Sequence, residues 1–159
     1  MSTATTLTEA LAAKLQARGY QLATAESCTG GLIAATCTSL SGSSLWFERG
    51  WVTYSNQAKT TELGVDSELI LQHGAVSEAV ARAMASGALQ HANAQVSVAV
   101  TGVAGPTGGS PDKPVGTVWL AWGLPQGVVS ERRVFSGDRD AVRQATVLYA
   151  LERLLALLD

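Results

Sequence analysis

The feature that most constrains this chain is the stretch Thr24–Gly31, which joins an apolar segment, residues 20–25, to a run of small residues, Leu32–Cys37. The first segment is compatible with a strand, and the second predicts a short helix. A strand that enters a helix through two glycines is typical of open α/β sheets, which bind ligands at the carboxyl ends of their strands. The stretch therefore predicts an α/β fold with a ligand site at this turn.

Two hydroxyl side chains, Ser27 and Thr29, lie in this turn, and Gly30 and Gly31 allow the backbone to approach a ligand closely. The N-terminus of a helix also offers free N–H groups to an anion or to a developing oxyanion. Either hydroxyl is therefore placed as a nucleophile or as a donor to an oxyanion. The alternative is a helix cap in which the glycines serve only the turn.

Helical and strand patterns alternate along the first hundred residues, and a hairpin then precedes a closing helix. A capping box at Thr6 and Glu9 is expected to start the first helix, which ends at Gly19. Further helices are expected over 57–63, 67–72, 78–91 and from Asp138 onward, and strands over 46–54, 95–101, 115–122 and 128–135. This order predicts one domain, residues 1–159, folded as a three-layer α/β/α sandwich on a mixed, mostly parallel sheet.

Several local features refine these elements. Gly50 is expected to form a bulge, Asn56 and Ser77 to cap helices, and residues 123–127 to form the turn of the hairpin.

Charged residues make up only 15% of the chain, against an average of roughly 25%. So few charges leave apolar surface uncovered, which predicts a homo-oligomer. The net charge of −2 and the absence of a Lys/Arg cluster argue against a nucleic-acid partner. No apolar run approaches ~18 residues, and the N-terminal segment lacks the pattern of a signal peptide. We therefore expect a cytoplasmic protein that does not bind membranes.

The residue types also argue against a metal or a cofactor. Cys28 and Cys37 fit neither a disulfide framework nor a zinc motif, and His73 and His91 are too few for a multi-histidine site, although a carboxylate site stays open. The glycines of 102–109 have the spacing of neither a Walker loop nor a dinucleotide fingerprint. We therefore expect no metal and no cofactor.

Lys59 is a candidate base for Ser27. If Asn56 caps a helix, Lys59 lies in its first turn, where the helix dipole and burial both favour the neutral amine. A neutral amine can act as the general base of a serine nucleophile. Tyr54, at the end of the preceding strand, could relay a proton or stack on a flat ring. The alternative for Lys59 is a surface lysine that points into water, and the alternative for Tyr54 is a core or rim tyrosine whose hydroxyl is in water.

A second glycine-rich turn follows the strand expected over 95–101. Thr101, Gly102 and Gly105 in this turn are expected to face the first turn across one cleft, because both turns follow strands. The alternative is a flexible surface loop.

Arg139 and Arg143 lie four residues apart at the start of the last helix. Two guanidinium groups on one face suit a phosphate. The alternative is local pairing with Asp138 or Asp140.

Other nucleophile arrangements are open but less well supported. Cys28 is the rival nucleophile, because a helix start lowers the pKa of a thiol, although adjacent residues normally point apart. A Ser-His-Asp triad would need His73 or His91. Neither is well placed, since His73 falls in a turn and His91 ends a helix.

Six segments together resemble the CinA C-terminal domain family. They are Ala25–Gly31 (AESCTGG), Val52–Lys59 (VTYSNQAK), His73–Ser77 (HGAVS), Thr101–Gly109 (TGVAGPTGG), Lys113–Val118 (KPVGTV) and Phe135–Arg139 (FSGDR). The segments occur in order and span nearly the whole chain, so the match is specific. The chain resembles the stand-alone form of the family, without the molybdopterin-binding-like N-terminal domain of full CinA proteins.

The resemblance implies an oligomeric, metal-free serine amidase with a three-layer α/β/α fold. Its enzymatic members hydrolyse the carboxamide of nicotinamide mononucleotide to nicotinate mononucleotide and ammonia. It implies that Ser27 is the nucleophile, Lys59 its base and Tyr54 a catalytic helper, with Thr101 and the arginines of the last helix at the substrate site. Backbone N–H groups of residues 29–31 would hold the oxyanion. The alternative is a non-catalytic module whose glycine loops hold a nucleotide or phosphate.

Overall fold

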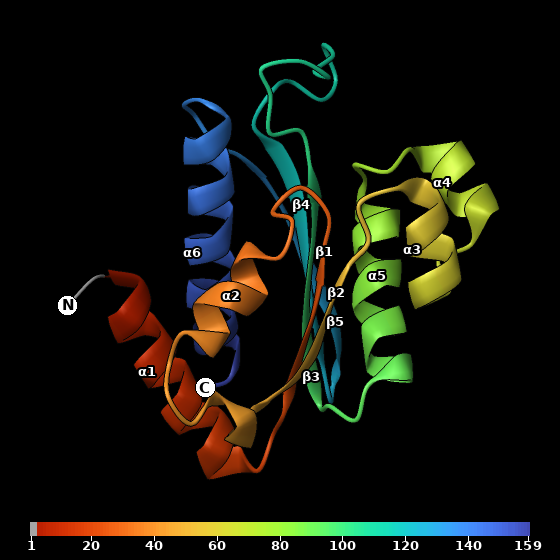
Figure 1. The fold of residues 1–159 in the computed structure, drawn as a ribbon. Coiled ribbons are helices and arrows are strands. Elements are labelled where there is room, and N and C mark those ends of the chain that lie inside the picture. Colours follow the sequence, from red (N-terminus) through yellow and green to blue (C-terminus); the bar gives the residue numbers. More distant parts are fainter. Residues whose placement is uncertain (1–2) are drawn as a thin grey trace.

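A computed structural model describes residues 3–159, in which one five-stranded sheet lies between two layers of helices (Figure 1). The strands are β1 (Leu22–Glu26), β2 (Phe47–Val52), β3 (Val96–Gly102), β4 (Thr117–Leu124) and β5 (Gly127–Val134). The helices are α1 (Thr3–Arg18), α2 (Leu32–Thr38), α3 (Asn56–Leu63), α4 (Ser67–His73), α5 (Glu78–His91) and α6 (Arg139–Leu157), with a short 3₁₀ turn at Ser43–Leu45.

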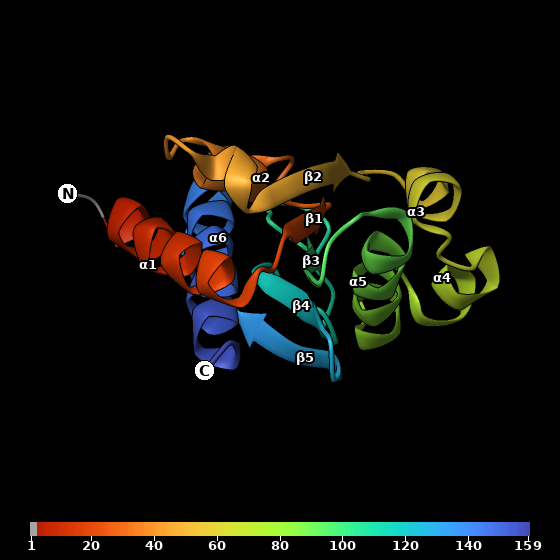
Figure 2. The same cartoon turned by 90° about the horizontal axis from the view of Figure 1, so that it is seen from below.

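The sheet has the order β2-β1-β3-β4-β5, which can be followed from one edge to the other in Figure 2. β1 is parallel to both β2 and β3, whereas β4 is antiparallel to β3 and to β5. β4 alone among these strands therefore runs against the others, so the predicted mixed, mostly parallel sheet is confirmed. Because β1 and β3 are parallel neighbours, the turns that follow them lie at the same edge of the sheet.

The two faces of the sheet carry different side chains. Helices α1, α2 and α6 cover the face with large apolar residues, among them Leu22, Val98 and Trp122 (Figure 1). Helix α5, flanked by α3 and α4, covers the face built from alanines such as Ala25 and Ala99. Since successive strand residues point to opposite faces, this alternation assigns each side chain of β1 to one layer or the other.

Four helix starts can be compared with the sequence analysis. Ser77 caps α5 as predicted, and Asp138 caps α6 at the position where that helix is expected to begin. Each of the two side chains accepts a hydrogen bond from a backbone N–H of the first turn. The cap of α3 is Ser55 rather than Asn56, because the Ser55 hydroxyl accepts from the N–H of Ala58 (3.0 Å). The predicted capping box at the start of α1 is wrong, since α1 already includes Thr3 and the box residues lie within the helix.

The predicted bulge at Gly50 is also misplaced. The irregularity between β1 and β2 falls at Glu48, because Leu22 pairs with Phe47 and the next residue of β1 pairs with Arg49. Gly50 pairs regularly with Thr24, and a Cβ on it would lie 2.5 Å from the Thr24 hydroxyl oxygen. The glycine therefore serves close packing between two strands.

The turn of the hairpin is shorter than predicted. Leu124 pairs with Gly127, so only Pro125 and Gln126 connect β4 to β5. Gly123 remains in the ladder, where a Cβ would lie 2.5 Å from the hydroxyl oxygen of Ser97 on β3. This glycine was misread as a turn residue because its role depends on a neighbouring strand.

Candidate active site

The end of β1 directs two consecutive side chains to opposite faces of the sheet. Glu26 lies on the α2 side of the sheet, where its carboxylate accepts hydrogen bonds from the N–H groups of Ile33 and Ala34. Ser27 lies on the opposite side, facing α3, and its own N–H extends the sheet by donating to the carbonyl of Val100. The pleat of the strand thus places the serine and the carboxylate in different layers.

Ser27 and Lys59 meet in this second layer. The Nζ atom of Lys59 lies 3.2 Å from the Oγ atom of Ser27, although the residues are 32 positions apart in the chain. Both side chains are buried, and Lys59 is only 1% exposed. Lys59 belongs to helix α3, which Ser55 caps shortly after the end of β2. Because β2 pairs with β1, the start of α3 lies close to the end of β1, where Ser27 follows.

The surroundings of Lys59 favour its neutral form. Burial lowers the pKa of the Lys59 amine below its ordinary value, and the nearby Cys28 only partly opposes this effect. The amine also lies within hydrogen-bond distance of the backbone carbonyls of Thr53 (3.1 Å) and Tyr54 (3.4 Å). A neutral amine has two N–H donors and one lone pair. The two carbonyls can accept both hydrogens, which leaves the lone pair for the hydroxyl of Ser27.

A pocket of about 210 Å³ opens over this pair. It is lined by six of the residues expected at a site and by five others: Ser27, Tyr54, Lys59, Thr101, Gly102 and Arg139, with Cys28, Asn56, Ala75, Val76 and Ala104. Both glycine-rich turns contribute to its wall, as predicted from their position after parallel strands. The geometry therefore gathers a hydroxyl, an amine, a phenol and a guanidinium around one small cavity.

Arg139 connects two sides of the pocket. One of its terminal nitrogens donates to the carbonyl of Gly105 (3.0 Å), and the other donates to the hydroxyl of Tyr54 (3.1 Å). Among the described residues, it forms no ion pair with Asp138 or Asp140, so the alternative of local pairing does not hold for it. Tyr54 is 60% exposed, which places the phenol at the rim rather than beside the amine of Lys59.

Thr101 closes the back of the pocket. Its hydroxyl donates to the carbonyl of Ala75 (3.0 Å) and thereby ties the end of β3 to the loop before α5. Gly102 is required next to it, because a Cβ there would lie 2.8 Å from the carbonyl oxygen of Thr117. The second turn is therefore packed against β4 rather than being a loose surface loop.

Five residues expected at the site do not line this pocket: Thr29, Gly30, Gly31, Gly105 and Arg143. The hydroxyl of Thr29 is directed at Glu26, and the N–H of Gly30 donates to the carbonyl of Ser27. Gly31 begins α2 with a left-handed backbone (φ 104°), a conformation that suits glycine. Thr29, Gly30 and Gly31 therefore belong to the serine turn without lining the pocket. Gly105 lies in the second turn, where its carbonyl accepts a hydrogen bond from Arg139.

Arg143 is the largest departure from the predicted site. Its guanidinium donates to the backbone carbonyls of Cys28 and Thr29, each at 3.2 Å. The predicted pair of phosphate-binding arginines is thus divided, because only Arg139 lies on the pocket wall. The spacing of four residues placed both on one face of α6, but their partners come from different loops.

Comparison with known proteins now identifies the family. Residues 4–158 match the CinA C-terminal domain. The chain belongs to the CinA C-terminal domain family. It is 57% identical over 157 residues to "Nicotinamide-nucleotide amidohydrolase PncC" of Pseudomonas putida, which covers 99% of this chain and 98% of that protein. It is 54% identical to the protein of the same name from Escherichia coli K12, over 93% of this chain and 90% of that protein.

A solved CinA-family structure has the same fold. The crystal structure of the competence/damage inducible protein CihA from Agrobacterium tumefaciens aligns with a TM-score of 0.96 at 45% identity, and covers 100% of this chain and 98% of that one. The three-layer α/β/α architecture described above is therefore that of the CinA family.

The other nucleophile candidates in this CinA domain are poorly placed. Burial raises the pKa of the Cys28 thiol to about 12, so it is protonated at neutral pH, and its side chain belongs to the core on the α6 side. His91 Nδ1 contacts the carbonyl of Gly87 on its own helix, and His73 is at the end of α4. Neither histidine lines the pocket over Ser27.

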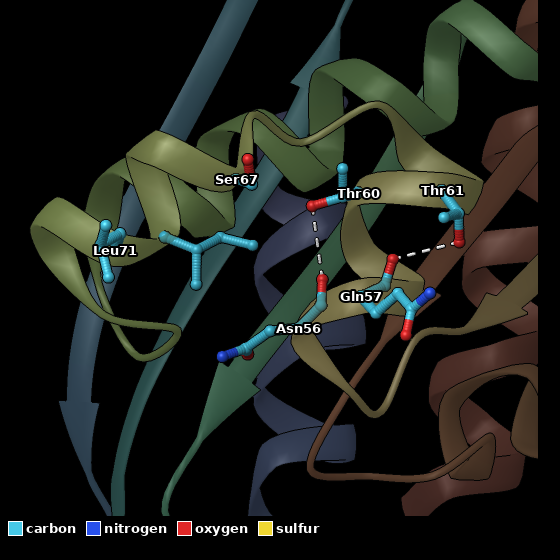
Figure 3. A pocket seen from close by; sticks show the side chains of 7 residues that line it. Asn56, Gln57, Thr60, Thr61, Ser67 and Leu71 are labelled. Atoms are coloured by element: carbon cyan, nitrogen blue, oxygen red, sulfur yellow. Dashed lines mark hydrogen bonds between the residues drawn. The ribbon is translucent and has the colours of Figure 1, made fainter.

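A larger pocket, of about 450 Å³, lies between α3 and α4 (Figure 3). Its lining residues carry hydroxyls, amides and aliphatic groups but no ionisable group: Asn56, Gln57, Thr60, Thr61, Ser67, Ile70 and Leu71. The hydroxyls of Thr60 and Thr61 donate to backbone carbonyls one helical turn earlier, as the dashed lines in Figure 3 show. The smaller pocket, in contrast, is lined by the ionisable side chains of Lys59 and Arg139.

Residues 3–159 contain no group of three or more His, Cys, Asp or Glu side chains arranged to hold a metal ion. In the same range, no helix combines the length and the apolarity needed to cross a membrane.

Proposed function

We propose that this chain hydrolyses the carboxamide of nicotinamide mononucleotide to nicotinate mononucleotide and ammonia, with Ser27 as nucleophile and Lys59 as base. The names of the close relatives support the substrate, and the 3.2 Å approach of Ser27 Oγ and Lys59 Nζ in a buried pocket carries the mechanism. A linear amide needs a strong nucleophile, and a buried neutral amine can generate one from a serine.

In the first half-reaction, Ser27 Oγ attacks the carboxamide carbon while its proton passes to Nζ of Lys59. The C–N bond of the tetrahedral intermediate then breaks, and the same proton moves from Nζ to the departing nitrogen, which leaves as ammonia. We assign the N–H of Cys28, beside the nucleophile on the pocket wall, as a donor to the oxyanion. A donor of this kind contributes ~3–4 kcal/mol to transition-state stabilisation in comparable sites.

In the second half-reaction, water attacks the ester on Ser27 and gives one proton to Lys59. Cleavage of the ester C–O bond returns that proton to Ser27 and releases the carboxylic acid, which ionises by giving its remaining proton to water or to the released ammonia. Ser27 and Lys59 carry the proton transfers of both half-reactions, and neither half-reaction includes a redox step.

The pocket of about 210 Å³ suits the pyridine ring and its carboxamide, with the ribose and phosphate extending past the rim. Arg139 is the phosphate donor we assign there. A guanidinium has five N–H groups, and only two are used by Gly105 and Tyr54. Tyr54 then holds Arg139 in place and covers one side of the ring.

The alternative is a nucleotide-binding module without turnover. Ammonia release from nicotinamide mononucleotide, followed with the unmodified protein, separates the two. We expect turnover that falls on the order of 10³-fold or more in Ser27→Ala and Lys59→Ala. Lys14→Ala is the matched control, because this lysine pairs with Asp159 away from the pocket. Binding of the nucleotide with no ammonia released would refute the proposed function.

We also propose that the enzyme is a homo-oligomer and that it is located in the cytoplasm. Several large apolar side chains are exposed on the single chain, including Val52 (55%) and Leu71 (81%), which supports further burial between copies. Sedimentation of the purified protein tests this, and a strictly monomeric species at micromolar concentration would contradict it.

A further inference from the structure

The buried carboxylate of Glu26 has no role in the proton transfers proposed above. It is 0% exposed and accepts three hydrogen bonds. Oε1 accepts from the hydroxyl of Thr29 (2.6 Å) and from the N–H of Ile33 (2.8 Å), and Oε2 accepts from the N–H of Ala34 (3.0 Å). Gly31 supplies no side-chain cap to α2, so this carboxylate takes the place of the missing cap.

The guanidinium of Arg143 approaches the same turn from α6. Its donors reach the carbonyls of Cys28 and Thr29, the two residues that follow the nucleophile. A Cβ on Gly30 would lie 3.4 Å from the guanidinium, so the arginine is in contact with the turn itself. The four residues after Glu26 are therefore held by a carboxylate that accepts hydrogen bonds and by a guanidinium that donates them.

We propose that Glu26 and Arg143 are positioning residues that fix the serine turn so that Ser27 Oγ faces Lys59. The inference rests on the proposed function for its reaction, but neither side chain lines the pocket or touches the reacting atoms. Glu26 sets where α2 begins relative to β1, and Arg143 fixes the two carbonyls next to the nucleophile. Together they hold the backbone on both sides of the short Ser27–Gly30 turn, which is closed by the N–H of Gly30.

The side of the sheet on which Glu26 lies is part of its role. Its carboxylate accepts hydrogen bonds from the N–H groups of α2, and the pKa of Lys59 is lowered by burial and only partly raised by Cys28. A carboxylate beside Lys59 would instead favour the charged ammonium and remove the base. Because the pleat of β1 directs Glu26 and Ser27 to opposite faces of the sheet, the carboxylate can neighbour the nucleophile in sequence without favouring the charged form of Lys59.

Kinetics of Glu26→Gln and Arg143→Lys test the proposal. Gln keeps the shape of Glu but presents an N–H₂ group to at least one donor, and Lys cannot span two carbonyls with a planar fork. A displacement of the nucleophile by 1 Å costs on the order of 10²-fold in rate. We therefore expect kcat to fall about 10- to 100-fold in each variant, with KM changed less than about threefold.

Two control variants separate positioning from general destabilisation. Asp66→Asn alters the cap of α4, and Arg82→Lys alters a guanidinium that donates to the carbonyl of Val128. Both lie away from the pocket over Ser27, so each is expected to keep wild-type kcat even if its melting temperature falls. Equal losses of kcat in the controls at matched melting temperature would overturn the proposal.

A comparison of substrates with and without a phosphate tests whether Arg143 positions the turn or binds the phosphate. If this arginine positions the turn, Arg143→Lys slows nicotinamide mononucleotide and nicotinamide riboside by the same factor. If it binds the phosphate, the variant raises KM for the mononucleotide alone, and that result overturns the assignment.

A phosphate-independent reagent separates this inference from the proposed function. A fluorophosphonate reacts with an activated serine, whose Oγ forms a P–O bond as the P–F bond breaks, and the serine proton leaves by way of Lys59 with fluoride. We expect labelling of Ser27, detected by peptide mass spectrometry, and at least about tenfold slower labelling in Glu26→Gln and Arg143→Lys. Unmodified protein that is labelled but releases no ammonia would refute the substrate and leave positioning supported. Equal labelling rates in wild type and variants, or no label on Ser27, would overturn positioning.

Discussion

At the scale of single residues, the unusual feature is a lysine with almost no exposed surface and no carboxylate partner among the described residues. Lys59 is 1% exposed, and its amine contacts one hydroxyl and two backbone carbonyls. Burial of an ionisable group without a counter-ion is costly for stability. Burial lowers the pKa of the Lys59 amine and so favours the neutral form, which is the form a serine needs as its base.

The pH dependence of activity follows from this lowered pKa. Lys59 accepts a proton only when neutral, so kcat/KM rises with pH as the amine loses its proton. Because the pKa is lowered, the rise is expected below 10.5, the ordinary value for lysine. A kcat/KM profile for nicotinamide mononucleotide measures it, and a decrease over the same range would argue against a lysine base.

Stability should depend on the same proton. At pH values between the lowered pKa and 10.5, the unfolded chain carries a charged Lys59 and the folded chain a neutral one, so folding releases a proton. The free energy of unfolding of the wild type, relative to Lys59→Met, is therefore expected to rise with pH between the lowered pKa and 10.5. The slope approaches at most about 1.4 kcal/mol per pH unit. Urea unfolding at several pH values measures this difference, and a flat or falling difference would show that the folded lysine is charged.

Cys28 is expected to be dispensable for the reaction. Burial raises the pKa of its thiol to about 12, so almost no thiolate exists at neutral pH. Cys28→Ala should retain kcat within about threefold, while Ser27→Ala loses it. The opposite pattern in ammonia release would make the thiol the nucleophile.

Residue identities predicted only part of the site. Ser27, Tyr54, Lys59, Thr101 and Arg139 could be inferred from strand ends and helix starts, and the structure places them around one pocket. Glu26 was overlooked because its partners are backbone N–H groups of the next helix, which leave no side-chain pattern. The carbonyl partners of Arg143 are hidden from sequence for the same reason.

At the scale of elements, α5 packs closely against α3, the helix that contains Lys59. Gly87 of α5 lies against the end of α3, where a Cβ would be 2.0 Å from the carbonyl oxygen of Leu63. The glycine therefore lets two helices approach more closely than any larger residue would allow.

Gly87→Ala is expected to destabilise the protein despite the better helix propensity of alanine. Propensity alone would favour alanine by about 1 kcal/mol, whereas overpacking costs about 1–3 kcal/mol. Chemical denaturation of Gly87→Ala should show a net loss. Gln90→Ala, an exposed change on the same helix, should stay within about 0.5 kcal/mol of wild type. A stabilised Gly87→Ala protein would contradict the close contact.

The types of the helices and strands were predicted better than the residues at which they begin and end. Hydrophobic periodicity gave the type of each long helix and strand, and side-chain caps located the starts of α5 and α6. The errors occur where a tertiary contact decides the role of a residue. Gly50 and Gly123 resemble bulge and turn residues in sequence, yet both remain in ladders beside a hydroxyl of the next strand.

At the scale of the whole molecule, the sheet brings distant segments together at one edge. The order β2-β1-β3 places the serine turn between two neighbouring strands. One is β2, which is followed by the helix that carries Lys59, and the other is β3, which contains Thr101. This order was not predictable from local pattern, because it depends on which crossovers pack on which face. The layered class was predictable, since alternating helices and strands have few ways to bury their apolar faces.

The central claim is that the acyl group of the substrate is transferred to Ser27 before water releases it. Acid quenching during turnover of nicotinamide mononucleotide, followed by peptide mass spectrometry, tests it directly. We expect a nicotinoyl ester, with or without its ribose phosphate, on the peptide that contains Ser27, and none in Ser27→Ala. An adduct on Cys28, or ammonia release that continues at the wild-type rate in Ser27→Ala, would contradict it.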